Sequence, residues 1–537
     1  MPLGHQYSSI EPTANDNDND DNDDIPSPLE SATSDNININ TNNNNPLRTT
    51  FDHDGTFFST FFSTFFHTRP AMHILLLTLL MSLGTGSVVS TIPGLLADRF
   101  ARLEYGYDGP PCSDFHDDGE TTTTANRKPQ ECRDGGDAAQ NAAASAVFVE
   151  NMIMLVLSSV VGSMSDCRGR RLFLAGSFVL MATTPLSLVL IQISDRASPY
   201  WYYSSKASHG LISSFTICLT ILSDVMPPEM RSPSYGLFLA TYLFGFGFSQ
   251  IMAKSLSHLM LAIVAAILLQ MGCIFTALIF CETLPEEARR KALSNRTCYE
   301  EGNHNSWGKI ILRPILELSI LNRNTFFRLL AAISLCSGMI YSSDSTLIIY
   351  YMKNQLDIGY QSIATMFFVK SLVGVLVQMF LLKLVIGCLR EKRSLVLGLM
   401  FGAIHNVLWG VSSTQTGIFT GLIMSEFAGL HFPILVGMRS ANVGEEEQGR
   451  VQGAFFALAA IADAVGPVLL QSIYRETKDT IRPGPGFMFV VAGCVYLFGA
   501  VVACLLPEDK ANVTVGSRTS DEDLEMDPER SQGLIMS

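Results

Sequence analysis

The chain has 537 residues, of which 47% are hydrophobic and only 16% are charged, and its mean hydropathy is +0.26. This composition is too apolar for a soluble protein with long polar tails, so we expect an integral membrane protein embedded in a lipid bilayer. The formal net charge of −14 is unfavourable for binding nucleic acid, although much of the acidity lies in the two tails.

Low-complexity sequence occupies much of the first 70 residues, in the runs "NDNDNDDNDD" and "NININTNNNN". Such segments bury too little apolar surface to offset the entropy lost on ordering, so we expect residues 1–70 and 508–537 to be disordered tails. The aromatic repeat "FFSTFFSTFFHT" at 57–68 is typical of an interfacial anchor. No cleavable signal peptide is recognisable, so the first span is expected to act as a signal anchor.

Apolar windows of about 20 residues, long enough to cross a bilayer, recur along the rest of the chain. They predict an all-α membrane protein with twelve transmembrane helices. The expected spans are residues 72–98, 143–164, 172–193, 207–226, 234–253, 259–281, 327–351, 362–386, 394–412, 416–438, 451–474 and 486–506.

The longest link between spans, residues 282–326, divides the twelve windows into two sets of six. We therefore expect an N-terminal half at 71–281, a linker at 282–326 and a C-terminal half at 327–507. The sixth and twelfth windows end in similar sequences, "GCIFTALIFCETLPEE" and "GCVYLFGAVVACLLPED". This similarity fits a duplicated six-helix unit.

Lys and Arg are more frequent in the links after spans two, four, six, eight and ten than in the links on the other side. Because these residues favour the cytoplasmic side, we expect the linker and both tails to be cytoplasmic. The basic residues at 99–142 weaken the bias. With this topology, the sequons at Asn295 and Asn512 face the cytoplasm and should carry no glycan. We expect the plasma membrane rather than an internal membrane such as the vacuole.

Cys112 and Cys132 are the two of eleven cysteines that fall in a link on the opposite side, where disulfides persist. We predict that they pair and stiffen the segment between them. The alternative is two free thiols near a proline turn.

The link between spans two and three reads "GSMSDCRGRR". With twelve spans divided six and six, this link resembles the signature of the major facilitator superfamily, Gly-x-x-x-Asp-[Arg/Lys]-x-Gly-[Arg/Lys]-[Arg/Lys]. Cys167 departs from the pattern, and Arg168 supplies the charge one residue later. "EEEQGRVQGAF", "PPEMRS" and "ETLPEE" look most like the branch of tetracycline exporters and proton-coupled folate and heme carriers. The matching positions are Gly162, Asp166, Gly169, Arg170 and Arg171.

This resemblance implies a cytoplasmic gate that favours the outward-facing state. Span eleven starts just after Arg450 on the same face as Asp166, so its positive helix end could hold that carboxylate. Arg170 and Arg171 could pair with Asp166 or with nearby carboxylates when the latch opens. The alternative is that these arginines only determine topology.

Two weaker family motifs concern coupling. Lys206 and Gly210 match an Arg-x-x-x-Gly spacing linked with proton transfer, but with lysine in place of arginine. Lys206 could equally be a lysine that snorkels to the interface. Span five lacks the Gly-Pro pair typical of drug antiporters, which puts proton antiport and the direction of transport in doubt.

Ionisable residues inside spans are the other functional candidates, because charges in hydrocarbon are costly and usually face a cavity or a partner. We expect His405 and His431 to be neutral packing residues, and no histidine has a metal-binding spacing. Asp344 and Lys370 lie at similar depths on consecutive helices, which predicts an ion pair between them. The acidic and basic candidates are Glu150, Asp344, Lys370, Glu426 and Asp463.

These features predict a monomeric secondary transporter of a small organic molecule that needs no cofactor and is coupled to protons. Export of a drug or metabolite is favoured over import of a nutrient or cofactor. Neither the repeated His, Asp or Cys motifs of a membrane enzyme nor a Gly-x-x-x-x-Gly-Lys-[Ser/Thr] motif is present. A membrane sensor without transport activity is the remaining alternative, because folds of this kind can be repurposed.

Overall fold

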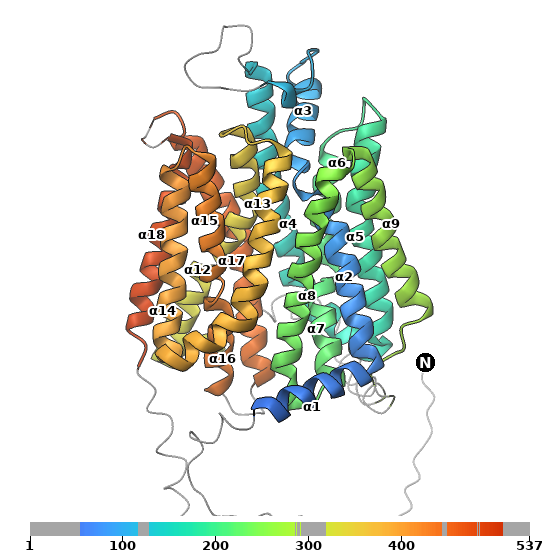
Figure 1. The fold of residues 1–537 in the computed structure, drawn as a ribbon, viewed down its shortest axis with the longest axis vertical. Helices are drawn as coiled ribbons and strands as arrows, with labels where there is room; N and C mark the ends of the chain where they lie inside the picture. The colour runs from blue at the N-terminus through green and yellow to red at the C-terminus, as the bar shows by residue number, and fades with distance from the viewer. Residues whose placement is uncertain are drawn as a thin grey trace, which may run out of the picture. The chain divides into compact units, whose positions relative to one another are not determined.

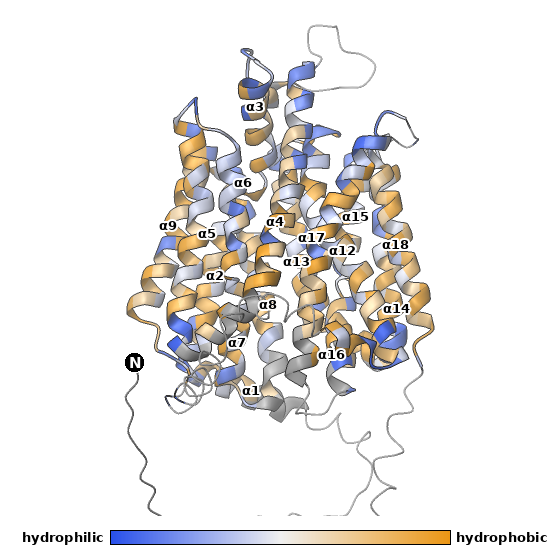
Figure 2. Ribbon diagram, turned by 180° about the vertical axis from the view of Figure 1, so that it is seen from behind, coloured by the Kyte–Doolittle hydropathy of each residue, from blue (hydrophilic) through white to orange (hydrophobic). Residues whose placement is uncertain are grey.

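The computed structural model describes residues 54–115, 128–284, 318–442, 448–480 and 484–507, with residues 286, 290 and 482. Within these residues the regular structure is helical, and twelve segments are long and apolar enough to cross a membrane. The predicted all-α fold with twelve spans is therefore confirmed. Figure 2 shows hydrophobic residues along the length of the spanning helices.

The first six spans, residues 69–278, are called the N-terminal half here. The fourth of them is interrupted, because Ser213 accepts a hydrogen bond from the backbone of Thr216 and so starts a new helix. The helices are α1 Asp54–His67, α2 Arg69–Val89, α3 Ile92–Glu104, α4 Gln130–Arg168, α5 Arg170–Ile193, α6 Tyr200–Ala207, η3 Ser208–Leu211, α7 Ser214–Val225, α8 Pro228–Ser255 and α9 His258–Leu278, with the short turn η1 Cys112–Asp114.

The last six spans, residues 325–504, are called the C-terminal half. Arg390 has a positive φ of 63° inside α14, and this kink separates the eighth span from the ninth. The helices are η4 Leu318–Asn322, α12 Thr325–Asn354, α13 Tyr360–Leu376, η5 Val377–Leu381, α14 Leu382–Val411, α15 Gln415–Ala428, α16 His431–Ala441, α17 Gln448–Thr477, η6 Gly484–Gly486 and α18 Phe487–Cys504.

The two halves meet mainly along three helix pairs. α4 packs against α17 and α12, and α8 packs against α13. Figure 1 shows α3 beside the end of α4 that extends beyond its neighbours. We call this end, which carries Cys112 and Cys132, the disulfide end. The opposite end, where Gly169 joins α4 to α5, is the motif end.

Several predicted boundaries differ from the structure, among them the start of the fourth span at Tyr200 rather than 207 and of the ninth at Leu384 rather than 394. The first span ends at Val89 rather than at 98, and α4 starts at Gln130 because the alanine-rich sequence before residue 148 forms helix without being strongly apolar. Helix α1 covers 54–67, within the tail expected to be disordered, because Phe61 and Phe65 are buried against the N-terminal half. Residues 1–53, 508–537 and most of the linker, with Asn295 and Asn512, lie outside the described residues.

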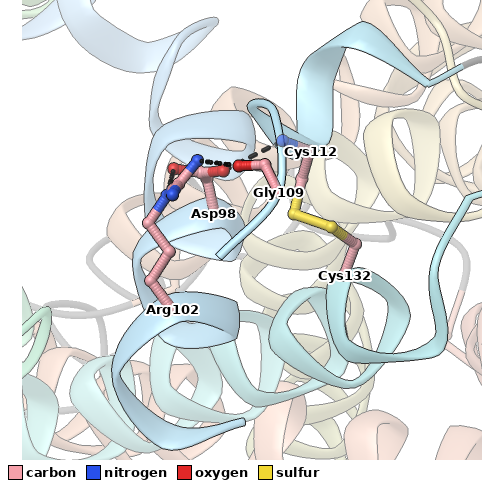
Figure 3. The surroundings of a disulfide bond; sticks show 5 residues. All are labelled: Asp98, Arg102, Gly109, Cys112 and Cys132. Atoms are coloured by element: carbon pink, nitrogen blue, oxygen red, sulfur yellow. Dashed lines mark hydrogen bonds and ion pairs between the residues drawn. A yellow bond between two sulfur atoms is a disulfide. The ribbon is translucent and has the colours of Figure 1, made fainter. Parts of the chain in front are cut away.

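At the disulfide end, the sulfur atoms of Cys112 and Cys132 are bonded, with their Cα atoms 5.7 Å apart (Figure 3). Asp98 accepts hydrogen bonds from the backbone N–H of Cys112 and from Nε of Arg102, both at 2.9 Å. Arg102 also donates to the carbonyl oxygen of Gly109. The hydrogen bond with Asp98 raises the pKa of Arg102 and favours its charged form. The disulfide therefore fixes this loop to α4, and the hydrogen bonds of Asp98 and Arg102 fix it to α3.

We expect the Cys112–Cys132 bond to stabilise the protein by about 3 kcal/mol, because it restricts the unfolded chain. On intact cells, an impermeant maleimide should label these cysteines only after reduction. Cys281, exposed at the motif end, is the matched control and should be labelled only after permeabilisation. Labelling of Cys112 and Cys132 without reductant would exclude the bond, and no labelling after reduction would contradict the expected orientation.

Candidate functional site

A first ion pair lies within the N-terminal half, between the second and fourth spans. The Nζ atom of Lys206 lies 3.4 Å from Oε1 and 3.3 Å from Oε2 of Glu150. Gly210 makes this approach possible, because a Cβ atom there would lie 2.1 Å from the backbone oxygen of Glu150. The Lys-x-x-x-Gly spacing therefore has a physical explanation in this chain. The lysine forms the ion pair, and the glycine lets the helices touch.

A second ion pair occupies the corresponding helices of the C-terminal half. Nζ of Lys370 on α13 lies 3.2 Å from Oε1 of Glu426 on α15. Gly374 follows the lysine by four residues, and a Cβ atom there would lie 2.3 Å from Oε2 of Glu426. Each half therefore joins its second and fourth spans by one Lys–Glu pair, with the acid and the base exchanged. The repeated spacing, "KASHG" and "KSLVG", is the sequence signal that could have revealed this.

The predicted pair between Asp344 and Lys370 is wrong. Lys370 pairs with Glu426, and Asp344 is held by two residues of α14. The prediction matched the depths of the two charges but not the directions in which they point. Consecutive helices α12 and α13 barely touch, because α12 packs mainly on α17 and α18 and α13 packs on α8 and α15.

Asp344 forms a buried cluster with His405 and Asn406. Its Oδ2 atom lies 3.1 Å from Nε2 of His405 and accepts a hydrogen bond of 2.9 Å from Asn406. Nδ1 of His405 must carry a hydrogen, because it contacts the carbonyl oxygen of Phe401, which can only accept. Nε2 of His405 also lies 2.9 Å from Nδ2 of Asn406. The three side chains therefore form one hydrogen-bonded cluster.

His405 is buried and packs against Trp409 and Tyr496, and its ring also contacts the carboxylate of Asp344. His431 fits the expectation: its ring is buried, contacts the carbonyl oxygen of Ala428 and packs against Tyr496. No group of three or more His, Cys, Asp or Glu side chains that could hold a metal ion occurs among the described residues.

Asp463 on α17 differs from the other intramembrane acids. Among the described residues no cation or hydrogen-bond donor contacts its carboxylate, which lies near Gly338 of α12. Its electrostatic neighbour is Glu150, a like charge. The backbone oxygen of Asp463 accepts a hydrogen bond of 3.0 Å from Ser342, so α17 is held against α12 at this level. The side chain is partly exposed.

Hydrogen bonds join the two halves at the disulfide end. Asp137 of α4 accepts hydrogen bonds from Tyr474 and Lys478 at the end of α17. Burial disfavours the charged form of Lys478, but its hydrogen bond to Asp137 and that residue's charge raise its pKa. Deeper in the same seam, Nε2 of Gln140 donates to Gln471 at 2.7 Å. Tyr203 and Tyr350 share a hydrogen bond of 3.2 Å between the halves. We call these contacts the disulfide-end closure.

At the motif end, Glu282 occupies a position that the sequence reasoning did not assign. Its carboxylate accepts hydrogen bonds from the backbone N–H groups of Arg170 (2.9 Å) and Arg171 (3.2 Å), at the start of α5. A negative group there is stabilised by the helix dipole. Gly169 has a φ of 96°, and a Cβ atom there would lie 2.3 Å from Oε2 of Glu282. Gly169, the second glycine of the motif, thus leaves room for the carboxylate of Glu282, which follows span six.

The two arginines of the motif bind within the N-terminal half. Nε of Arg170 lies 3.1 Å from Oδ2 of Asp224 on α7, and Arg171 donates to the carbonyl oxygens of Thr276 and Ala277 at the end of α9. Arg168 is exposed, and Gly162 lies within α4. The side chains of Asp166 and Arg450 lie outside the described part of the chain. The latch predicted between Asp166 and span eleven stays a prediction.

Comparison with known proteins decides the family. The model of the Major Facilitator Superfamily matches residues 135–467, which is more than half of the chain. The chain belongs to this superfamily. It is a membrane transporter of a small molecule, not an enzyme, as the sequence predicted.

Relatives and solved structures agree with this assignment. The human "Hippocampus abundant transcript-like protein 1" is 22% identical over 71% of this chain and 77% of its own length. The "Tetracycline resistance protein, class C" of Escherichia coli is 20% identical over 64% of this chain and 82% of its own length, which confirms the predicted resemblance to tetracycline exporters.

Two crystal structures share the fold. The human organic anion transporter MFSD10 (TETRAN) has a TM-score of 0.57 and 19% identity, and the match covers 81% of this chain and 99% of that chain. The nucleoside transporter NupG has a TM-score of 0.54 and 12% identity, and the match covers 82% of this chain and 99% of that chain.

The cap at the start of α5 can be tested by substitution. Glu282→Gln should lower the free energy of unfolding by about 0.3–1 kcal/mol, because it removes the charge that faces the helix dipole. Gly169→Ala should cost about 1–3 kcal/mol, because it adds strain at a positive φ and displaces Glu282. Thermal unfolding of the purified protein in detergent measures both changes. Gly236→Ala is the matched control, since no atom of a described neighbour lies within 4 Å of its added methyl group. Equal effects of the two glycine substitutions would contradict the cap.

Proposed function

We propose that this transporter is driven by protons and exports a small organic molecule in exchange for them. The observation that carries the proposal is Asp463, an acid inside a span that has no basic partner among the described residues. Glu150 and Glu426, the acids of the second and tenth spans, are each paired with a lysine. Asp463 is therefore the group at which a proton would change the charge of the site.

The charges of the site can be counted directly. Glu150, Glu426 and Asp463 are acids, and Lys206 and Lys370 are bases. The site carries one net negative charge when Asp463 is ionised and none when it is protonated. A charge that is not neutralised costs much more inside a bilayer than in water, so Asp463 should bind either a proton or a positive group of the substrate.

The exposure of the neighbouring side chains supports a transport route at this level. Lys206 and Lys370 retain 37% and 29% of their side-chain exposure, although both lie within spans, Tyr200–Val225 and Tyr360–Leu381. Tyr341 of α12 is 62% exposed and lies within the electrostatic range of Lys370, Glu426 and Asp463. Charged groups rarely face lipid, so we infer that these side chains line a polar path between the halves.

Competition between a proton and the substrate for Asp463 would couple the two, since each would bind when the other leaves. Such competition produces exchange, and exchange with an inward proton gradient produces export. The resemblance to a tetracycline resistance protein supports the same direction. The proposed coupling follows from the charges of the site, so it does not depend on the Gly-Pro pair that span five lacks.

The proposed cycle uses both ends of the bundle. The disulfide-end closure, which joins Asp137 to Tyr474 and Lys478, would hold the transporter open toward the motif end. We propose that the motif end faces the cytoplasm, as the distribution of Lys and Arg predicts. In the opposite state, Asp166 would bind the start of α17 and close the cytoplasmic side.

The test begins with the substrate. Cells that express the chain and cells that lack it are compared by metabolomics of cytoplasm and medium, and the compound whose distribution changes is then used in proteoliposomes with an imposed pH gradient. We expect the wild type to accumulate this compound against its gradient. Asp463→Asn should abolish proton-driven accumulation but keep passive exchange, because only the titrating group is lost. Asp479→Asn, just beyond the end of α17, is the matched control and should behave as the wild type.

Proton-driven accumulation by Asp463→Asn would contradict the coupling role of this residue. Accumulation that does not depend on the pH gradient in the wild type would contradict proton coupling itself. Binding of the compound without any flux would favour a sensor.

A further inference from the structure

A groove of about 660 Å³ lies outside the proposed transport route, at the disulfide end. It is lined by residues of α4, α6 and α17, and α6 and α17 belong to different halves. Figure 1 shows α3 beside the upper part of α4, and the end of α3 closes the top of the groove with Glu104 and Tyr105.

The groove opens away from the interior of the protein. On α4, Glu150 and Gly136 face neighbouring helices, where they meet Lys206 and Asn354. Asn141 lies nine residues before Glu150, which places it on the opposite side of the helix at 100° per residue. The groove residues Asn141, Ser145 and Val149 share this outer side and are exposed. In a membrane protein, such an exposed lateral face contacts lipid.

The groove changes character along its length. Fifteen residues of α4 separate Asp134 at the top from Val149 at the bottom, a distance of about 22 Å. The top carries charged and aromatic side chains, whereas the lower part is lined by small residues such as Ala142 and Ala146. One leaflet of the hydrocarbon core is about 15 Å thick, so the groove matches one leaflet and its headgroup layer.

Both signs of charge occur at the top of the groove. Glu104 and Asp134 line it, together with the rings of Tyr105 and Tyr200. Arg475 of α17 also lines it, and the described residues offer Arg475 no hydrogen bond or ion pair. A guanidinium binds phosphate through two parallel hydrogen bonds, and carboxylates with aromatic rings bind ammonium groups. Lys478 is already paired with Asp137 and is not needed for binding.

We propose that this groove binds one zwitterionic glycerophospholipid from the leaflet at the disulfide end. Its phosphate lies on Arg475, its ammonium group lies near Glu104 and Asp134, and an acyl chain follows the small residues of α4. Because α6 and α17 come from different halves, the site is complete only while the disulfide-end closure is formed. The bound lipid therefore stabilises that closure, by thermodynamic linkage.

The test uses the full chain in nanodiscs that contain a photoactivatable phosphatidylcholine with the reactive group on its acyl chain. We expect crosslinks on α4 between Ala138 and Val149. Arg475→Gln should reduce their yield about tenfold, as expected for the loss of a charge-assisted hydrogen bond. Arg482→Gln removes an exposed arginine beyond the same helix and should leave the yield unchanged. Glu476→Gln, next to Arg475 but outside the groove, is a second control.

Competitors define the ligand. Unlabelled phosphatidylcholine should suppress the crosslinks, whereas soluble glycerophosphocholine should not, because it lacks acyl chains. Equal yields in the wild type and Arg475→Gln would overturn the proposal, as would stronger competition by the anionic phosphatidylglycerol. Competition by the transported compound would identify the groove as a substrate site instead. Since none of these measurements uses a proton gradient, they are independent of the coupling role proposed for Asp463.

Discussion

The cost of placing an unpaired charge inside a bilayer is the constraint on which this structure depends. Each half meets it in the same way, with one lysine and one glutamate on its second and fourth spans. Two glycines, Gly210 and Gly374, are required for these pairs because any side chain there would collide with the glutamate residue. The pairs therefore depend on close helix packing, and the packing explains why a glycine follows each lysine by four residues.

The same constraint gives the remaining acids different roles. Asp344 is held by His405 and Asn406 in a buried hydrogen-bonded cluster, which lowers the cost of keeping its carboxyl group within the membrane. Asp463 has no such partner among the described residues, and the nearby Glu150 is an acid as well, so their negative charges would repel each other. A site in which all charges but one are balanced responds strongly to a single proton. This is the physical basis of the coupling that we propose.

Much of the fold could be predicted from the sequence, because span length and apolar composition are local properties. The family motif could also be recognised from its spacing. The partners of the charged residues could not, since hydropathy gives the depth of a residue but not the direction of its side chain. Asp344 and Lys370 have similar depths and point to different helices. Glu282 was missed because its role depends on a contact between segments 112 residues apart. The repeated Lys-x-x-x-Gly spacing was the available signal for the second ion pair.

The most direct test of the central claim measures the protonation of Asp463 itself. Infrared difference spectra of the purified protein in lipid, recorded as the pH is raised, should contain a protonated carboxyl band that disappears. The account predicts that this band is absent from Asp463→Asn and unchanged in Asp479→Asn. An identical titrating band in Asp463→Asn would show that another group carries the proton and would contradict the account.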